Sequence, residues 1–285
     1  MKKVLITGAN SYIGTSFENY VEENCIDFEI DTLDLLNPNW QEFDFSGYDS
    51  VFHVAGIAHF SKDESKKDLY YKVNTELTEK VAMIAKQAGV NQFVFMSSII
   101  VYGDSTSSER IITKDTKPSP SDFYGDSKWQ AEQKLGKLLE PDFGIVIIRP
   151  PMIYGKGSKG NYPKLSKLAQ SIPIFPKISN SRSMLHIDNL CEFVKQLILN
   201  EEQGVFFPQN TEYVNTSELV KQIAEAHGKK VHLTKVLNPI INVMFPLDTV
   251  KKVFGNLTYD KQLSKYDFNY QVRTFEESIY LTERK

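Results

Sequence analysis

The chain has 285 residues, of which 41% are hydrophobic and 24% are charged, as in ordinary soluble globular proteins. This length allows one large domain or two small ones. The net charge of −3 gives no reason to expect a nucleic acid or an anionic membrane as a partner, and we expect neither. No apolar run approaches the ~20 residues of a membrane span, and we see no secretory leader, so we expect a cytoplasmic location. Cys25 and Cys191 stand far apart and are expected to be reduced thiols.

Short apolar runs and amphipathic segments alternate along the chain. The predicted strands are 3–7, 28–33, 50–54, 92–96 and 144–148, and the predicted helices are 12–23, 73–88, 123–139, 186–199 and 217–227. This alternation predicts an α/β fold with a doubly wound parallel sheet of the Rossmann type. Ligands bind such sheets at the carboxyl ends of the strands.

The character of the chain changes after about residue 150, where Gly, Pro and Ser become frequent. We expect a dinucleotide-binding domain over 1–150 plus about 183–207. A smaller α+β substrate domain is expected over about 151–182 and 208–285. Residues 151–183 are predicted to form loops with one short helix.

The segment Thr7-Gly8-Ala9-Asn10-Ser11-Tyr12-Ile13-Gly14 joins the first predicted strand to the first helix. Such a turn aims free N–H groups and the positive end of the helix dipole at a phosphate. Ser11 replaces the usual middle glycine, but serine is small enough to let a pyrophosphate approach. The alternative is an ordinary strand-to-helix turn.

A carboxylate at the end of the second strand commonly binds the adenosine ribose. Asp31 and Asp34 are both candidates, and the alternation of the strand favours Asp34. A carboxylate opposes a 2′-phosphate, so the pattern favours NAD slightly over NADP. The alternative is that both are solvated acids.

Tyr124 and Lys128 are four residues apart and share one face of a predicted helix. An ammonium near a phenol lowers the pKa of the phenol and suits it to proton transfer. Ser97 and Ser98 follow a buried strand and offer a hydroxyl that can orient a substrate oxygen. An amphipathic surface pair is the alternative.

Together these motifs resemble the extended short-chain dehydrogenase/reductase family, also called the NAD-dependent epimerase/dehydratase family, over almost the whole chain. Further segments carry the resemblance: His53-Val54-Ala55-Gly56, Asn74, Val101-Tyr102-Gly103, Arg149-Pro150, Tyr154-Gly155 and His186-Ile187-Asp188-Asn189-Leu190. It implies a Rossmann domain, NAD or NADP as cofactor, and a nucleotide sugar as substrate. Met152 departs from the pattern, because many UDP-sugar epimerases have asparagine there.

The resemblance assigns roles to residues. The implied catalytic residues are Ser98, Tyr124 and Lys128. The implied cofactor-binding residues are Gly8, Asn10, Ser11, Tyr12, Ile13, Gly14, Asp31, Asp34, Leu35, Val54, Ala55, Gly56, Asn74, Ser97, Tyr124, Lys128 and Pro151. The resemblance also implies that Ser98 contacts the substrate and that Arg182 binds its diphosphate. Asn161 and Lys164 are further substrate-binding candidates, for which the alternative is a solvated loop.

Several segments are similar to bacterial capsule and O-antigen reductases that act on the C4 ketone of UDP-2-acetamido-2,6-dideoxy-hexulose. They are 149–155, 160–162, 181–183 and 254–257. The similarity implies a UDP-sugar 4-ketoreductase. A UDP-sugar 4-epimerase that uses the same groups is the alternative, and a non-catalytic dinucleotide sensor is a third.

A metal site is not expected, because His53, His59, His186, His227 and His232 lack ligand spacing. The family resemblance also implies a homodimer through helices near 66–88 and 123–139. The same apolar faces could equally be buried within one copy.

Overall fold

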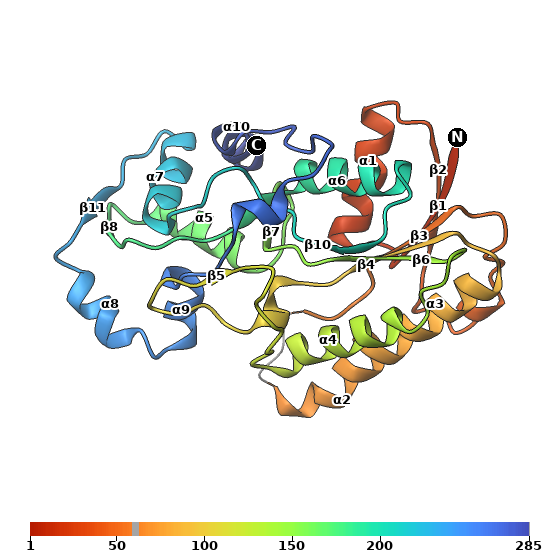
Figure 1. Ribbon diagram of the computed structural model, residues 1–285. Coiled ribbons are helices and arrows are strands. Elements are labelled where there is room, and N and C mark those ends of the chain that lie inside the picture. Colours follow the sequence, from red (N-terminus) through yellow and green to blue (C-terminus); the bar gives the residue numbers. More distant parts are fainter. Residues whose placement is uncertain (59–62, 285) are drawn as a thin grey trace. The chain divides into compact units, whose positions relative to one another are not determined.

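The computed structural model describes residues 1–58 and 63–284 and divides into two compact units (Figure 1). The first unit comprises 1–103, 117–150 and 190–208, and the second comprises 104–116, 151–189 and 209–285. The division differs from the predicted boundaries at 104–116 and at 183–189. The cause is strand pairing, because β5 and β9 each pair with a strand of the second unit.

The first unit is built on a six-stranded sheet with the order β10-β6-β4-β3-β1-β2, in which every pairing is parallel. Its strands are β1 Lys2–Thr7, β2 Phe28–Leu33, β3 Ser50–His53, β4 Gln92–Met96, β6 Gly144–Ile148 and β10 Gly204–Phe206. β3 and β4 are buried along their whole length, as is typical of central strands in a parallel sheet that is covered on both faces. The predicted α/β Rossmann-type fold is confirmed.

Helices cover both faces of this sheet (Figure 1). They are α1 Tyr12–Glu23, α2 Lys67–Tyr70, a π-helix Tyr71–Leu77 (η3), α3 Thr78–Gln87, α4 Phe123–Gly136 and α6 Ile187–Leu199; short 3-10 turns lie at Trp40–Glu42 (η1), Glu64–Lys66 (η2) and Ile99–Tyr102 (η4). On one face, α3 and α4 bury Val81 and Leu135 in a cluster with Phe93. On the other face, Phe17 of α1 packs edge-on against Phe52 of β3, with ring centroids 5.3 Å apart.

The second unit contains short strand pairs and helices. Its elements are β5 Ile111–Ile112, β7 Met152–Tyr154, α5 Asn161–Ser171, β8 Ile174–Pro176, β9 Met184–His186, α7 Thr216–Ala226, β11 His232–Thr234, α8 Asn238–Met244, α9 Asp248–Phe254, β12 Thr258–Tyr259, η5 Lys261–Ser264 and α10 Phe275–Glu283. The strands pair as β12 with β5, β7 with β9 and β11 with β8, all parallel. A second apolar cluster, which includes Leu165 of α5 and Ile223 of α7, fills this unit.

The interval 151–183 has more regular structure than its sequence predicts. The strands β7 and β8, each three residues long, fall in this interval, which is rich in Gly and Pro. Such short strands carry no usable period, so propensity alone does not reveal them. Within residues 1–58 and 63–284, no helix has both the length and the apolar character needed to cross a bilayer.

Candidate functional site

The turn after β1 has the geometry that its glycines predict. Gly8 adopts a φ of +121°, and a Cβ placed there would lie 2.8 Å from the backbone nitrogen of Ala55. A Cβ on Gly14 would lie 3.1 Å from the Ile6 side chain, so this glycine lets α1 pack closely on β1. Asn10, between them, has a φ of +59°. The backbone therefore fits a dinucleotide cradle, in which the start of α1 meets a strand end with little side chain in the way.

Ser11, where a glycine was expected, is the N-cap of α1. Its hydroxyl oxygen accepts a hydrogen bond of 3.1 Å from the backbone nitrogen of Gly14. The substitution thus satisfies one of the amides that a helix start leaves free. Tyr12 and Ile13 are the first two residues of the helix and are partly exposed.

The two acidic candidates on the second strand lie in different surroundings. Asp31 pairs in register with Leu5, in mid-strand, and its carboxylate accepts a 2.7 Å hydrogen bond from the Tyr48 hydroxyl. Asp34 follows β2 and is exposed, and its carboxylate accepts a bond from the Leu36 amide. Leu35 packs partly on the apolar cluster beneath the sheet. Of the two acids, only Asp34 stands at the carboxyl edge.

The segment Val54-Ala55-Gly56 follows β3 at the same edge. Its backbone is held by Asn74, whose Oδ1 accepts from the Ile57 amide at 2.8 Å and whose Nδ2 donates to the Ile57 carbonyl at 3.0 Å. Asn74 lies in the π-helix, and π-helical turns are frequent at functional sites. A Cβ on Gly56 would lie 3.0 Å from Asn74 Oδ1 and 3.1 Å from Lys128 Nζ. Three separate segments therefore meet at Gly56.

Lys128 is buried beneath this edge. Its Nζ donates a 2.9 Å hydrogen bond to the carbonyl oxygen of Met96 and lies 4.6 Å from the centroid of the Phe95 ring. Burial lowers the pKa of Lys128 to about 8, while the nearby charge of Glu132 acts in the opposite direction. The ammonium is thus held by a backbone carbonyl and an aromatic face.

Burial raises the pKa of Tyr124 to about 12, and the nearby hydroxyl of Ser98 acts in the opposite direction and only partly offsets this. The direction differs from the sequence-based expectation, in which Lys128 lowers the pKa of the phenol. The reason is that desolvation disfavours the phenolate, while Lys128 Nζ directs its hydrogen bond to Met96.

Behind the dyad lies a buried ion pair that the sequence analysis missed. Glu132 of α4 accepts hydrogen bonds from the guanidinium of Arg149, with a closest distance of 2.5 Å. Ser97 donates its hydroxyl to the same carboxylate, and Arg149 donates to the Tyr102 hydroxyl at 2.5 Å. The hydroxyl of Ser97 is therefore engaged within the protein. The four-residue spacing of Lys128 and Glu132 on one helix was the feature of the sequence that could have revealed a buried acid next to the lysine.

In the second unit, two of the quoted segments pair with each other. The Ser181 amide donates to Asn256 Oδ1 at 2.9 Å, and Nη1 of Arg182 donates to the Gly255 carbonyl at 3.0 Å. Nε of Arg182 is buried and finds no hydrogen-bond partner among the described residues. Burial lowers the pKa of Arg182 to about 10. A half-buried guanidinium with a spare donor is suited to an anion.

The remaining predicted residues also belong to the second unit. Pro151 is buried directly before β7. Asn161 and Lys164 lie in the first turn of α5 and are exposed. Of the predicted catalytic and cofactor-binding residues, all except Pro151 lie in the first unit.

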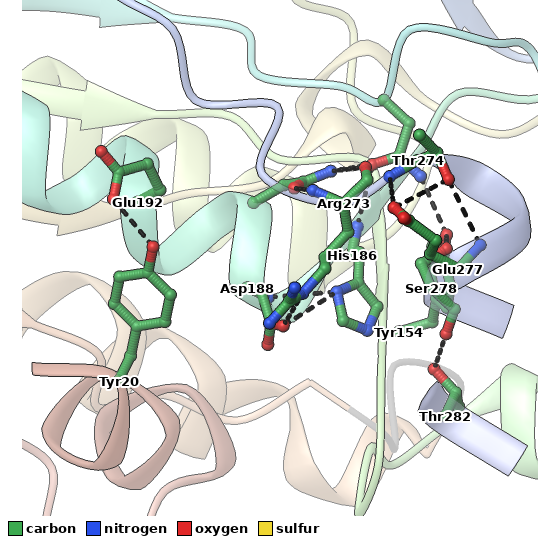
Figure 2. A network of polar contacts seen from close by, with 12 residues as sticks. Tyr20, Tyr154, His186, Asp188, Glu192, Arg273, Thr274, Glu277, Ser278 and Thr282 are labelled. Atoms are coloured by element: carbon green, nitrogen blue, oxygen red, sulfur yellow. Dashed lines mark hydrogen bonds and ion pairs between the residues drawn. The ribbon is translucent and has the colours of Figure 1, made fainter. Parts of the chain in front are cut away.

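The segment that contains His186, Asp188 and Asn189 holds the chain before α10 (Figure 2). The Asp188 carboxylate accepts a 2.8 Å bond from Nε of Arg273, and Asn189 Oδ1 accepts from the Arg273 amide at 2.8 Å. His186 is buried, which lowers its pKa to about 4, and its ring lies edge-on to Tyr154 with centroids 5.3 Å apart. These contacts are structural, and Tyr154 is a buried packing residue.

The other described histidines have ordinary partners. His53 lies between the hydroxyls of Thr7 and Thr78, at 2.8 and 3.0 Å, and burial lowers its pKa to about 3. His227 pairs with Glu283 at 2.7 Å. His232 is exposed at the start of β11, and His59 lies outside the described residues.

The model of the NAD dependent epimerase/dehydratase family matches residues 4–207 of the chain. The chain belongs to this family. It is 31% identical to a UDP-glucose 4-epimerase of Vibrio cholerae over 251 residues, which are 80% of this chain and 76% of that protein. It is 28% identical over 277 residues to an N-acetyl-alpha-D-glucosaminyl-diphospho-ditrans,octacis-undecaprenol 4-epimerase of Escherichia coli O157:H7, covering 88% and 81%.

A solved dTDP-4-dehydrorhamnose reductase from Clostridium acetobutylicum has the same fold, with a TM-score of 0.77, 19% identity and 98% coverage of each chain. Structures of this fold include one solved with NAD and one solved with NADP. The chain is thus an enzyme of the NAD-dependent epimerase/dehydratase family.

Proposed function

We propose that the protein is a nucleotide-sugar 4-ketoreductase, which uses NADH or NADPH to reduce the C4 ketone of a UDP-4-keto-6-deoxy-N-acetylhexosamine. The product would serve as a precursor of a bacterial surface polysaccharide. One observation carries the proposal: Tyr124, whose phenol is influenced by the hydroxyl of Ser98, lies one helical turn from the buried ammonium of Lys128. A hydroxyl, a phenol and an ammonium in this order suit proton transfer to a carbonyl oxygen.

The residues present fit a dinucleotide. The cradle of Gly8 and Gly14 would hold the pyrophosphate, Asp34 the adenosine ribose, and the segment 54–56 with Asn74 and Lys128 the nicotinamide end. The bound cofactor supplies the hydride. The exposed carboxylate of Asp34 favours NADH over NADPH, because it repels a 2′-phosphate.

The protein's own residues handle the proton. Ser98 would donate a hydrogen bond to the C4 carbonyl oxygen and polarise it. Tyr124 would release its phenolic proton to that oxygen as the hydride adds to the carbon. The pKa of about 12 keeps the phenol protonated until negative charge develops on the substrate. The ammonium of Lys128 then stabilises the phenolate that remains.

Arg182 would bind the diphosphate of the substrate. Its spare Nε and its lack of an ion pair within the described part of the chain support this role. Asn161 and Lys164, exposed on α5, are proposed as secondary contacts. Met152, which stands where many epimerases have asparagine, favours the reductase.

A 4-epimerase is the second candidate, because both sequence relatives named above carry that activity in their names. The same three residues would serve, with Tyr124 accepting a proton during oxidation at C4 and returning it during reduction of the other face. One of these relatives acts on a sugar whose diphosphate is attached to a polyprenol. Whether the sugar of the substrate is attached to UDP or to a polyprenol diphosphate is therefore a further question for experiment.

The deciding experiment follows the absorbance of reduced nicotinamide with purified protein and a UDP-4-keto-6-deoxy-N-acetylhexosamine. Stoichiometric loss of the band with NADH or NADPH supports the reductase. No loss, together with NAD that stays bound through purification, supports the epimerase, which is then assayed with UDP-N-acetylglucosamine.

Tyr124→Phe should abolish turnover in either case and leave cofactor affinity nearly unchanged. Tyr71→Phe is the matched control, since the Tyr71 hydroxyl donates to Asp126 on the same helix as Tyr124. Unchanged turnover in the Tyr124→Phe variant would reject the site assignment.

A further inference from the structure

The segment from Val236 to Leu247 in the second unit carries apolar side chains on both of its faces. Ile241 and Phe245 pack against the apolar cluster of that unit. On the opposite side, Ile240, Val243 and Met244 of α8 are 55%, 81% and 40% exposed. Val236 before the helix and Leu247 after it are 80% and 54% exposed. We call these five exposed residues the α8 patch.

Within α8, the exposed residues 240, 243 and 244 lie within one helical turn of one another, while Ile241 packs on the core of the second unit. One side of α8 is therefore anchored inside the protein, while Ile240, Val243 and Met244 are exposed to water. Single exposed apolar residues are common, but several on one short segment favour a surface that another body covers. Ile174 of β8, which is 52% exposed, adds to the apolar surface of the strand pair that precedes α8.

Charge around the patch identifies the kind of partner. Residues 229–257 contain five lysines (229, 230, 235, 251 and 252) and one acid, Asp248, which gives a local charge of +4 against −3 for the whole chain. Lys177 and Lys235 are exposed, and the Lys177 carbonyl accepts a 2.9 Å bond from the side chain of Asn238 in α8. Among the described residues, none of Lys177, Lys235, Lys251 and Lys252 forms a salt bridge.

We propose that the α8 patch docks the enzyme on an anionic lipid surface. Val236, Ile240, Val243, Met244 and Leu247 would enter the boundary between headgroups and acyl chains, and the neighbouring lysines would contact lipid phosphates. Apolar side chains combined with lysines match both layers of such an interface, whereas a protein partner would be expected to supply acidic groups and a shaped pocket. The net charge of the chain, which argues against a membrane partner, conceals this local excess of lysine. Figure 1 shows α8 and α9 as neighbouring short helices joined by a tight turn.

The test is sedimentation of the purified protein with sucrose-loaded vesicles. Vesicles of phosphatidylcholine alone are compared with vesicles that also contain phosphatidylglycerol, each at low and at high salt. We expect binding to the anionic vesicles that weakens as salt rises. Failure of the wild-type protein to sediment with anionic vesicles would overturn the proposal.

Two double variants separate the apolar contribution to vesicle binding from the electrostatic one. Val236→Ser with Val243→Ser should weaken vesicle binding by about tenfold or more, because two exposed apolar side chains are removed. Lys177→Gln with Lys235→Gln should remove most of the preference for anionic lipid. Leu36→Ser is the control, since Leu36 is 91% exposed in the first unit and its loss should not affect binding.

Light scattering distinguishes a second copy of the chain from lipid. If Val236→Ser with Val243→Ser converts a dimer into a monomer without affecting vesicle binding, the patch is an interface between copies and the proposal is wrong. Turnover of a water-soluble substrate should be the same in all variants, because none of the altered residues belongs to the proposed catalytic site. The proposal is thus tested independently of the reaction.

Discussion

Glu132 of α4 and Arg149, the residue after β6, form an ion pair whose side chains are 2% and 8% exposed. The guanidinium also lies over the ring of Tyr102, 5.1 Å from its centroid. A buried pair of this kind contributes little net stability, but breaking it leaves an uncompensated charge in the interior.

Arg149→Met should therefore destabilise the protein by about 3–5 kcal/mol, because Glu132 is left buried and unpaired. Glu132→Leu combined with Arg149→Met should recover most of that loss, since both charges are removed. Urea denaturation followed by circular dichroism measures the difference. A double variant as unstable as the single one would show that shape, not charge, dominates at this position.

The second prediction concerns pH. A lysine carries its charge below its pKa, so catalytic efficiency should fall as the pH rises through about 8, the pKa of Lys128. The charge of Glu132 raises the pKa of Lys128. Glu132→Gln should therefore move the alkaline fall to lower pH.

Glu79→Gln is the control for this pH profile, because Glu79 pairs with Lys134 at the exposed end of α4. Its profile should match that of the wild type. A profile that is the same in Glu132→Gln and in the wild type would reject the link between Glu132 and Lys128.

The third prediction concerns the turn after β1. Gly8→Ala should lower NADH affinity by roughly tenfold or more, because the new Cβ would meet the backbone of Ala55 at 2.8 Å and displace the cradle. Gly47→Ala is the matched control, since Gly47 also has a positive φ, of +79°, but nothing lies within 4 Å of its Cβ position. Fluorescence titration with NADH measures the affinity of both variants, and equal affinities would contradict the proposed cradle.

The fourth prediction follows from His53. Its pKa is about 3 in the folded protein, below the ordinary 6.5, so the unfolded chain binds a proton that the folded chain does not. Stability from this group is complete above pH 6.5 and is lost as the pH falls toward 3, by at most about 1.4 kcal/mol per pH unit. His53→Gln should reduce the slope of the unfolding free energy against pH between about pH 3 and 6.5, by an amount that corresponds to about one bound proton. An unchanged slope would show that His53 is protonated in the folded state.

The sequence predicts the first unit well because its signals are local. The unbroken apolar runs of β4 and β6 and the glycine-containing turn after β1 suffice to place them, and the observed strands Gln92–Met96 and Gly144–Ile148 match the predicted ranges. The π-helix over Tyr71–Leu77 was predicted as ordinary α-helix, because the pattern of apolar residues does not reveal one extra residue in a turn.

The parts that could not be predicted depend on contacts distant in sequence. The short strand β5 pairs with β12, almost 150 residues away in the second unit. Likewise, the state of Tyr124 depends on how much water its neighbours exclude, which the Tyr-x-x-x-Lys spacing does not encode. The partner of Glu132 was also hidden, since Arg149 lies 17 positions further along the chain.

Ser11 has a consequence for the order of the phosphate turn. A glycine at this position would leave the Gly14 amide without this side-chain partner, whereas the Ser11 hydroxyl accepts its hydrogen bond at 3.1 Å. The start of α1 is therefore held in place by the chain's own side chain, and an ordered turn has less conformational freedom to lose when a pyrophosphate docks.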